Sequence, residues 1–215
     1  MKVSQIASVA FILIASFFVY SFVATAREGE TRRACTALCS LKPHYVDQVR
    51  RAPEFELPNL RGQLVELSDY RGKTLILNFW SKTCPPCLEE MPSLAQLAHT
   101  LAGRTDIALL TITSDESAAD AQETLSSILG QDAPFEVLVD PDATVIGDLF
   151  GTKLYPETWF IDREGVIRAR VDGARDWSKA EVVDMALALD NPIACPVRIH
   201  EGRAQGAGAS FCGQN

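Results

Sequence analysis

The sequence is poor in positive charge and contains no run of clustered lysines and arginines. Its 215 residues include 20 Lys and Arg against 28 Asp and Glu, which gives a formal net charge of −8. A basic stripe is the usual electrostatic footprint of nucleic-acid binding and of attachment to anionic membranes. Its absence argues against both partners. Internal repeats are also absent, and the length without the N-terminal segment fits one domain with a proper core.

Charge is missing altogether from residues 3–26. Residues 6–23 are strongly apolar, Lys2 precedes them, and Ala24-Thr25-Ala26 resembles a cleavage site, so we expect a secretory signal peptide over residues 1–26. An uncleaved anchor in the inner membrane is the alternative, because the apolar run is close to the length that spans a bilayer. No cysteine closely follows the run, which argues against a lipoprotein. In either case the rest of the chain is expected outside the cytoplasm, periplasmic or secreted, where stable disulfides are allowed.

Cysteine is sparse, and its six copies fall into two groups. Cys84 and Cys87 form a C-x-x-C pair in the middle of the chain. The other four lie outside the central domain, two before it and two after it: Cys35, Cys39, Cys195 and Cys212. Secreted chains usually pair an even number of cysteines, so we expect two structural disulfides, whose three connectivities stay open. A zinc site and a second redox pair at Cys35 and Cys39 are the alternatives; the paired C-x-x-C spacing that zinc sites favour is missing.

The central pair lies where an apolar, strand-like run (residues 74–80) gives way to a helical pattern. Cys84 is expected at the N-cap of that helix, where the helix dipole and the backbone N–H of Cys87 would stabilise a thiolate. Cys87, one turn later, is within reach to close a disulfide. The spacing therefore predicts a redox pair with Cys84 as the exposed nucleophile and Cys87 as the resolving thiol.

Hydrophobic periodicity divides the chain into an N-terminal extension (27–51), a central domain (52–190) and a C-terminal tail (191–215). A short helix over residues 34–41 would place Cys35 and Cys39 on one face. In the central domain we expect strands at 55–57 and 64–67 (a hairpin), 75–80, 107–113, 135–139, 158–161 and 166–171, and helices at 84–102, 117–129, 142–150 and 179–189. This order predicts an α/β fold with a mixed sheet, helices on both faces, and the cysteine pair at the carboxyl end of a central strand.

Several motifs of the central domain resemble one family. They are Leu67-Ser68-Asp69-Tyr70-Arg71-Gly72-Lys73, Asn78-Phe79-Trp80, Cys84-Pro85-Pro86-Cys87, Glu90, Pro92, Tyr155-Pro156-Glu157-Thr158 and Phe160-Ile161-Asp162-Arg163-Glu164-Gly165. Over residues 52–189 the chain resembles the thioredoxin fold, more closely the extracytoplasmic TlpA/ResA/CcmG-type thiol–disulfide oxidoreductases. The hairpin before the central strand and the helical insertion at 117–129 also resemble this group.

The resemblance implies roles for four residues. Pro156 would be a cis-proline facing the cysteine pair, and Trp80, Tyr155 and Pro156 would contact substrate; a plain turn proline is the alternative for Pro156. Glu90 would take the proton of the buried thiol, as a partly buried carboxylate with a raised pKa could do. An ordinary acid in the first turn of a helix is its alternative reading. The resemblance also implies that Pro92 kinks the helix.

The residues around the pair set the expected redox direction. Pro85 and Pro86 have no N–H, and no His or Lys lies between the cysteines, so only the Cys87 N–H can stabilise the Cys84 thiolate. We therefore expect a weakly oxidising disulfide and a reductase or isomerase, without cofactor or metal. Reduction of disulfides in secreted or cytochrome c-maturation substrates is the leading function. A disulfide-bearing protein substrate and an upstream membrane thiol reductant are the implied partners. Thr83 stands where the family usually has an aromatic residue, so the rim beside Cys84 is smaller and more polar.

Two other functions are alternatives for a cysteine pair in this fold. A copper chaperone would need a third soft or imidazole ligand beside the two thiols, and His44, His99 and His200 are scattered along the chain. A peroxiredoxin-like peroxidase would need threonine three residues before the attacking cysteine, where this chain has Ser81.

Overall fold

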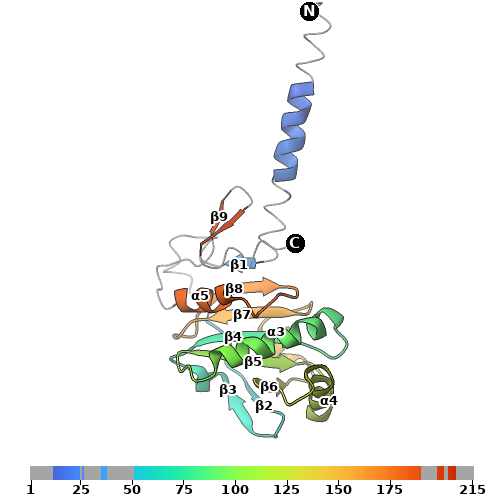
Figure 1. Cartoon of the computed structure of the whole chain (residues 1–215), viewed down its shortest axis with the longest axis vertical. Coiled ribbons are helices and arrows are strands. Elements are labelled where there is room, and N and C mark those ends of the chain that lie inside the picture. Colours follow the sequence, from blue (N-terminus) through green and yellow to red (C-terminus); the bar gives the residue numbers. More distant parts are fainter. Residues whose placement is uncertain are drawn as a thin grey trace, which may run out of the picture.

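The computed structural model describes residues 12–24, 26, 35–37, 51–189, 198–200 and 203–206 (Figure 1). Its strands are β1 (Cys35–Ala37), β2 (Glu56–Pro58), β3 (Leu64–Glu66), β4 (Thr74–Trp80), β5 (Ile107–Thr113), β6 (Glu136–Val139), β7 (Glu157–Ile161), β8 (Ile167–Asp172), β9 (Arg198–His200) and β10 (Arg203–Gln205). Its helices are α3 (Pro85–Leu101), α4 (Ala118–Leu129) and α5 (Ala180–Ala188), with a 3₁₀ turn η2 (Leu67–Tyr70) and a π-helical turn η3 (Thr144–Leu149). Residues 12–24 are also helical, and among the described residues no helix is both long and apolar enough to cross a bilayer.

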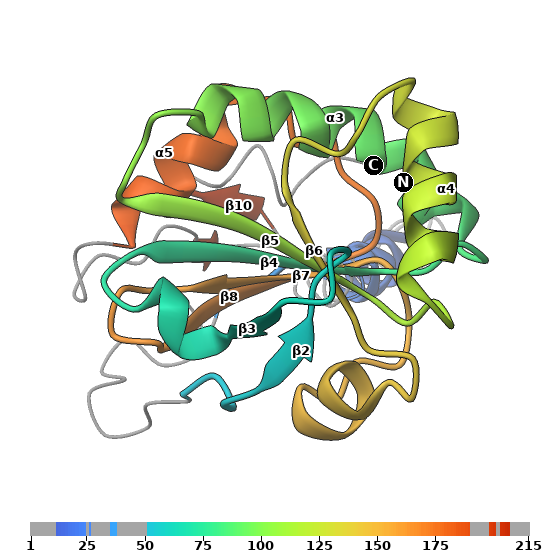
Figure 2. The ribbon, with the colours of Figure 1, turned by 90° about the horizontal axis from the view of Figure 1, so that it is seen from below.

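A six-stranded mixed sheet with the order β1-β8-β7-β4-β5-β6 forms the centre of the molecule (Figure 1). β4 pairs parallel with β5 and antiparallel with β7, so it is buried on both edges and on both faces. Figure 2 shows α3 and α5 on one side of this sheet, with the hairpin β2–β3 and the η3 turn on the other. The predicted thioredoxin fold, with its N-terminal hairpin and its helical insertion α4, is confirmed.

Apolar side chains of β4 alternate between two hydrophobic cores, one on each face of the sheet. Ile76 and Trp80 join the cluster beneath α3 and α5, whereas Leu75, Leu77 and Phe79 join the cluster on the opposite face. Because successive side chains of a strand point to opposite faces, an unbroken apolar run is what a strand covered on both sides requires. The position between Ile76 and Trp80 carries the polar Asn78, which is completely buried on the α3 side.

Two expectations about the flanking segments were wrong. Residues 35–37 form a strand, not a helix: they pair antiparallel with β8, with Cys35 opposite Val171, because the edge of β8 offers unpaired backbone groups. The tail forms the antiparallel hairpin β9–β10, where no strand was expected. In the central domain, the helix expected over 142–150 is present as the shorter π-helical segment η3. It follows Ala143, which adopts the left-handed conformation (φ 50°), and the Asp140 carboxylate accepts the Ile146 N–H at 2.9 Å.

Candidate active site

Cys84 and Cys87 lie at the carboxyl end of β4, where the chain turns into α3. Their sulfurs are joined in a disulfide of 2.02 Å. Cys84 is the N-cap of α3, and its Sγ accepts the backbone N–H of Cys87 at 3.2 Å. Cys87 is completely buried, whereas Cys84 is partly exposed. Cys84 is therefore the more accessible cysteine of the pair.

The two prolines between the cysteines occupy the first turn of α3 and are both exposed. Proline at the start of a helix is favourable because the N–H it lacks would have no intrahelical partner. The consequence for the site is electrostatic: Pro85 and Pro86 offer no N–H to Cys84, so the Cys87 amide is left as the backbone donor to its sulfur.

Asp115, which follows β5, accepts two hydrogen bonds from the loop that carries Cys84. One Asp115 oxygen accepts the Lys82 backbone N–H at 2.7 Å and the Ser81 hydroxyl at 3.3 Å. Asp115 is 2% exposed, and Ser81 in turn contacts the Thr83 hydroxyl at 3.0 Å. Asp115 was missed in the sequence, although the signal was there: the carboxyl ends of parallel neighbours β4 and β5 meet at the same edge of a sheet.

The cis-proline loop lies beside the same edge. The Tyr155–Pro156 peptide bond is cis, as the resemblance implied. Phe79 of β4 pairs with Glu157 at the start of β7, so one further step along the register brings Pro156 opposite Trp80. Tyr155 is half-buried and packs against both hydrophobic clusters, and Cys84 packs against the first of them.

Trp80 does not fit the substrate-contact role that we predicted for it. Its side chain is 0% exposed, and its indole N–H donates to the Thr111 hydroxyl of β5 at 3.3 Å. The reason is positional: Trp80 is the last residue of a strand covered on both faces, and it points into the cluster beneath α3. Trp80 supports the cysteine loop from within the core and offers no surface to a partner.

Glu90 is buried on the same face of α3 as Cys87, three residues further along. Its carboxylate accepts three N–H donors from two distant elements. The Asn78 amide of β4 donates to one oxygen at 2.8 Å, and the Arg175 backbone N–H and the Trp177 indole N–H donate to the other at 3.0 Å and 2.8 Å. A surface acid of a helix N-terminus would face solvent, so this alternative reading of Glu90 does not describe its environment.

Burial raises the pKa of Glu90 from 4.5 to about 7. The hydrogen bonds from Trp177, Arg175 and Asn78, and the Arg175 charge, act in the opposite direction and only partly offset the cost of desolvation. A group that changes protonation near neutral pH is well matched to accepting a thiol proton and returning it.

A second buried carboxylate, Glu157, follows the cis-proline directly. It is 6% exposed, it accepts the Thr152 hydroxyl, and Arg170 lies 3.8 Å from its other oxygen. Burial raises the pKa of Glu157. The Thr152 hydrogen bond and the Arg170 charge lower it and partly offset this increase. In the sequence, Glu157 carries no signal beyond its place in a family motif.

Behind Glu90, a groove of about 550 Å³ separates α3 from the loop between β8 and α5. It is lined by Glu89, Glu90, Pro92, Ser93, Gln96, Ala174, Arg175, Asp176 and Ser178. Because Glu90 is one of the lining residues, the groove borders the turn of α3 that carries the buried carboxylate.

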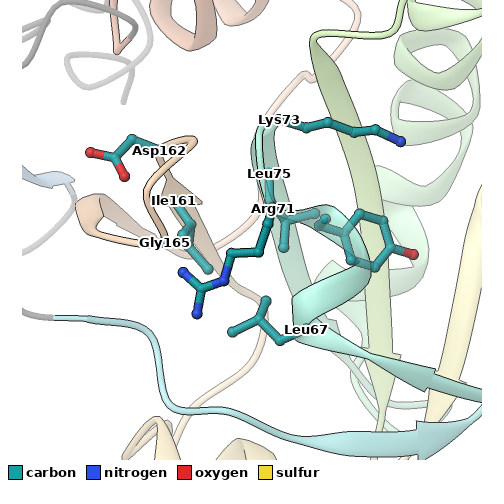
Figure 3. A pocket seen from close by; sticks show the side chains of 8 residues that line it. Leu67, Arg71, Lys73, Leu75, Ile161, Asp162 and Gly165 are labelled. Atoms are coloured by element: carbon teal, nitrogen blue, oxygen red, sulfur yellow. The ribbon is translucent and has the colours of Figure 1, made fainter.

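A second hollow lies at the opposite end of β4 and is too small for a substrate (Figure 3). Its volume is about 10 Å³, roughly the space of one water. Figure 3 shows the Arg71 side chain extending toward Gly165, and Arg71 donates to the Glu164 carbonyl at 2.9 Å and pairs with Glu54. Gly165 has φ +79°, and a Cβ there would overlap the Arg71 guanidinium. Two of the family motifs thus meet here in a structural contact.

The four outer cysteines were predicted to form two structural disulfides. Cys39, Cys195 and Cys212 fall outside the described residues, and only the backbone of Cys35 is described, as the first residue of β1. Their pairing stays a prediction. Within the described part of the chain, no three His, Cys, Asp or Glu side chains gather as metal ligands.

Several known proteins are similar to the central part of this chain. Thioredoxin-like protein YneN of Bacillus subtilis (strain 168) is 30% identical over 123 residues, which are 57% of this chain and 70% of that protein. Thiol-disulfide oxidoreductase ResA of Geobacillus thermodenitrificans (strain NG80-2) is 30% identical over 122 residues, 57% of this chain and 67% of its own. The crystal structure of a putative thiol:disulfide interchange protein DsbE from Chlorobium tepidum matches with a TM-score of 0.56 and 28% identity, over 66% of this chain and 95% of that one.

The fold, the cysteine pair at the N-terminus of α3 and these relatives define a thiol–disulfide oxidoreductase of the thioredoxin fold. The AhpC/TSA family model matches residues 49–170, more than half of the chain. The chain belongs to the AhpC/TSA family and, within it, to the TlpA/ResA/CcmG-type oxidoreductases.

Proposed function

We propose that the protein is an extracytoplasmic disulfide reductase that works through Cys84 and Cys87 with Glu90 as proton carrier. The observation that carries the proposal is the asymmetry of the pair: one sulfur is accessible, and the other is buried on the same helix face as a buried carboxylate. Such an arrangement separates attack on a substrate from resolution inside the protein.

The reaction begins with the reduced pair. The Cys84 thiolate attacks a substrate disulfide, one substrate thiolate leaves, and a mixed disulfide forms between Cys84 and the other substrate sulfur. Cys87 then gives its proton to the Glu90 carboxylate, and the resulting thiolate attacks the Cys84 sulfur. The second substrate thiolate leaves and takes up a proton from solvent, and Glu90 releases the proton of Cys87 to solvent. Two electrons have then moved from the pair to the substrate. The enzyme is left with the Cys84–Cys87 disulfide.

The direction of transfer follows from the weak stabilisation of the Cys84 thiolate. A disulfide is strongly oxidising when its reduced, ionised form is strongly stabilised. Here the helix N-terminus and the single Cys87 N–H act on Cys84, and the intervening prolines add nothing. The pair is therefore proposed to donate electrons, with an upstream membrane thiol reductant restoring it.

The substrate class and location follow from the same reading. The apolar N-terminal segment supports export, with cleavage or with retention as an inner-membrane anchor. Outside the cytoplasm the disulfides available are those of secreted proteins and of apocytochrome c, and these are the proposed substrates.

Trapping the mixed disulfide tests the proposal. Cys87→Ala cannot resolve the intermediate, so substrates should accumulate covalently on Cys84 in the native compartment and be released by dithiothreitol. Cys84→Ala is the matched control, because it keeps one thiol but removes the accessible one. Equal capture by both variants, or no capture by Cys87→Ala, would refute the mechanism.

The redox direction has its own measurement. Equilibration against glutathione should place the pair well below the roughly −120 mV of strongly oxidising periplasmic enzymes. A potential near that of such oxidants would contradict a reductase.

A further inference from the structure

The Glu90 carboxylate depends on a loop far away in sequence. Two of its three donors, the Arg175 backbone N–H and the Trp177 indole N–H, come from the loop between β8 and α5, 85 and 87 residues further along the chain. Both donate to the same oxygen. An N–H that donates to a carboxylate stabilises the charged form and therefore lowers the affinity of the group for a proton.

The indole of Trp177 is fixed in place from two sides. It is 0% exposed and lies in the core beneath α3, 6.4 Å from the Phe160 ring, centroid to centroid. Its backbone N–H donates to the Ser93 hydroxyl of α3 at 3.0 Å, and the same hydroxyl lies 2.8 Å from the Glu90 carbonyl. The turn of α3 that carries Glu90 and the loop that carries Trp177 are therefore tied together independently of the carboxylate.

We propose that Trp177 is a positioning residue that sets the proton affinity of Glu90, and thereby the pH at which Glu90 can accept the proton of Cys87. The proposal rests on the proposed role of Glu90 in resolution. When Cys87 loses its proton, Glu90 changes from a carboxylate to a neutral acid. The Trp177 indole N–H stabilises the carboxylate relative to the acid. Without this donor the carboxylate holds its proton more tightly, and fewer molecules are ready to accept one at neutral pH.

Other charged and polar groups lie around Glu90. The Arg175 guanidinium faces both Glu90 and Asp172, and its charge lowers the pKa of Glu90. Glu89 on α3 and Asp176 in the loop line the groove beside it. From the sheet, Asn78 shares its amide between Glu90 and the Thr158 hydroxyl. Replacing the Trp177 side chain leaves each of these residues in the sequence.

A measurement on the unaltered protein tests the contact directly. In the oxidised protein the cysteines do not titrate, so a ¹⁵N–¹H spectrum between pH 5 and 9 reports Glu90 without interference from the thiols. The indole resonance of Trp177 should titrate with the same midpoint as the ¹³C chemical shift of the Glu90 side-chain carboxyl. Glu90→Gln should abolish that movement. A Trp177 indole signal that stays constant while Glu90 titrates would overturn the proposal.

A pair of matched variants tests the consequence. Trp177→Phe keeps a ring in the core and removes the N–H, and should raise the Glu90 midpoint by about one pH unit, a tenfold change in proton affinity. The pH profile of mixed-disulfide resolution should shift by the same amount. Trp159→Phe is the control, because Trp159 is equally buried but lies in the core on the other face of the sheet. It should leave both midpoints unchanged.

The outcomes separate this proposal from the one it rests on. If Glu90→Gln leaves the pH profile of resolution unchanged, the proposed role of Glu90 fails. If Glu90→Gln removes the pH dependence but Trp177→Phe leaves the midpoint where it was, the role of Trp177 fails alone. If Trp177→Phe does not fold, the resonance measurement on the unaltered protein decides.

Discussion

Family motifs lie at both ends of β4, yet those motifs differ in what they do. At the carboxyl end stand a disulfide, a cis-proline and a buried carboxylate with a pKa of about 7. At the amino end, Arg71, Gly72 and Gly165 lie in a small closed network: Arg71 donates to the Glu164 carbonyl, and the Gly72 N–H donates to the Arg163 carbonyl at 3.1 Å. The residues of this network carry no sulfur.

The difference shows that residues of a family motif can be required either for backbone geometry or for chemistry. The contacts around the motif show which of the two applies. At the amino end the constraint is geometric, because Gly165 adopts a positive φ beneath the Arg71 guanidinium. At the carboxyl end it is chemical, because a charged group is kept in the core at a cost in desolvation. Substitutions at the two ends should therefore separate activity from stability.

The largest effect is expected at Cys84. Cys84→Ser removes the nucleophile and should lower disulfide reduction by on the order of a thousandfold or more. The stability of the oxidised fold is not comparable, since the variant has no central disulfide, so the reference is the reduced wild-type protein. Insulin reduction and thermal unfolding, both measured in dithiothreitol, check the prediction. Activity above a tenth of wild type would show that the chemistry lies elsewhere.

Glu90→Gln should change how stability depends on pH. The pKa of Glu90 is raised in the folded protein, so its contribution to stability is full below the unfolded value of about 4.5 and is lost as pH rises through about 7. The oxidised wild type should lose up to about 3 kcal/mol of unfolding free energy between pH 5 and pH 8 from this group. Urea unfolding at both pH values checks this.

The glutamine variant should show a much flatter pH dependence, because it cannot ionise. Glu89→Gln is the control, since Glu89 is its exposed neighbour on α3, and it should behave as wild type. An unchanged slope in Glu90→Gln would show that Glu90 is not the group that titrates.

Asp115→Ala should have a moderate effect on activity. It removes the acceptor of the Lys82 N–H and the Ser81 hydroxyl, so the loop that carries Cys84 is no longer held to the end of β5. We expect about a tenfold loss of kcat/KM, because small misplacements of a reacting group are costly. Asp120→Ala is the control: it loses the ion pair with the Lys82 side chain and the hydrogen bond from the Ser117 hydroxyl, but no contact to the backbone of the cysteine loop. Equal losses in both variants would argue against a role for the buried carboxylate.

Gly165→Ala is expected to have the smallest effect, on stability alone. Alanine at a positive φ beneath Arg71 should cost roughly 1 kcal/mol of unfolding free energy. Reduction by the remaining folded protein should be unchanged, because the hollow of Figure 3 lies at the far end of β4 from Cys84. Chemical denaturation and insulin reduction, measured on the same preparation, check both halves. Reduced activity at full stability would mean that the two ends are coupled.

Much of the fold could be predicted because its strongest signals are local. The apolar run of β4, the helical period of α3 and the glycine after α4 each specify an element within a few residues. The wrong expectations fell on segments whose structure is decided by a partner: residues 35–37 became a strand because the edge of β8 was open to them. Trp80 was misread because its place in a family motif says nothing about which way the side chain points.

The sequence by itself determined the redox pair: Cys84 caps a helix, Cys87 follows one turn later, and the two prolines leave one backbone donor between them. These are contacts within four residues, so local geometry is sufficient. Only the tertiary structure decided the environment of the pair. Asp115 lies under its loop, and Arg175 and Trp177 reach Glu90 across 85 and 87 residues of chain. The affinity of a buried carboxyl for its proton is the balance of desolvation against such donors, and that balance exists only once the distant segments have packed together.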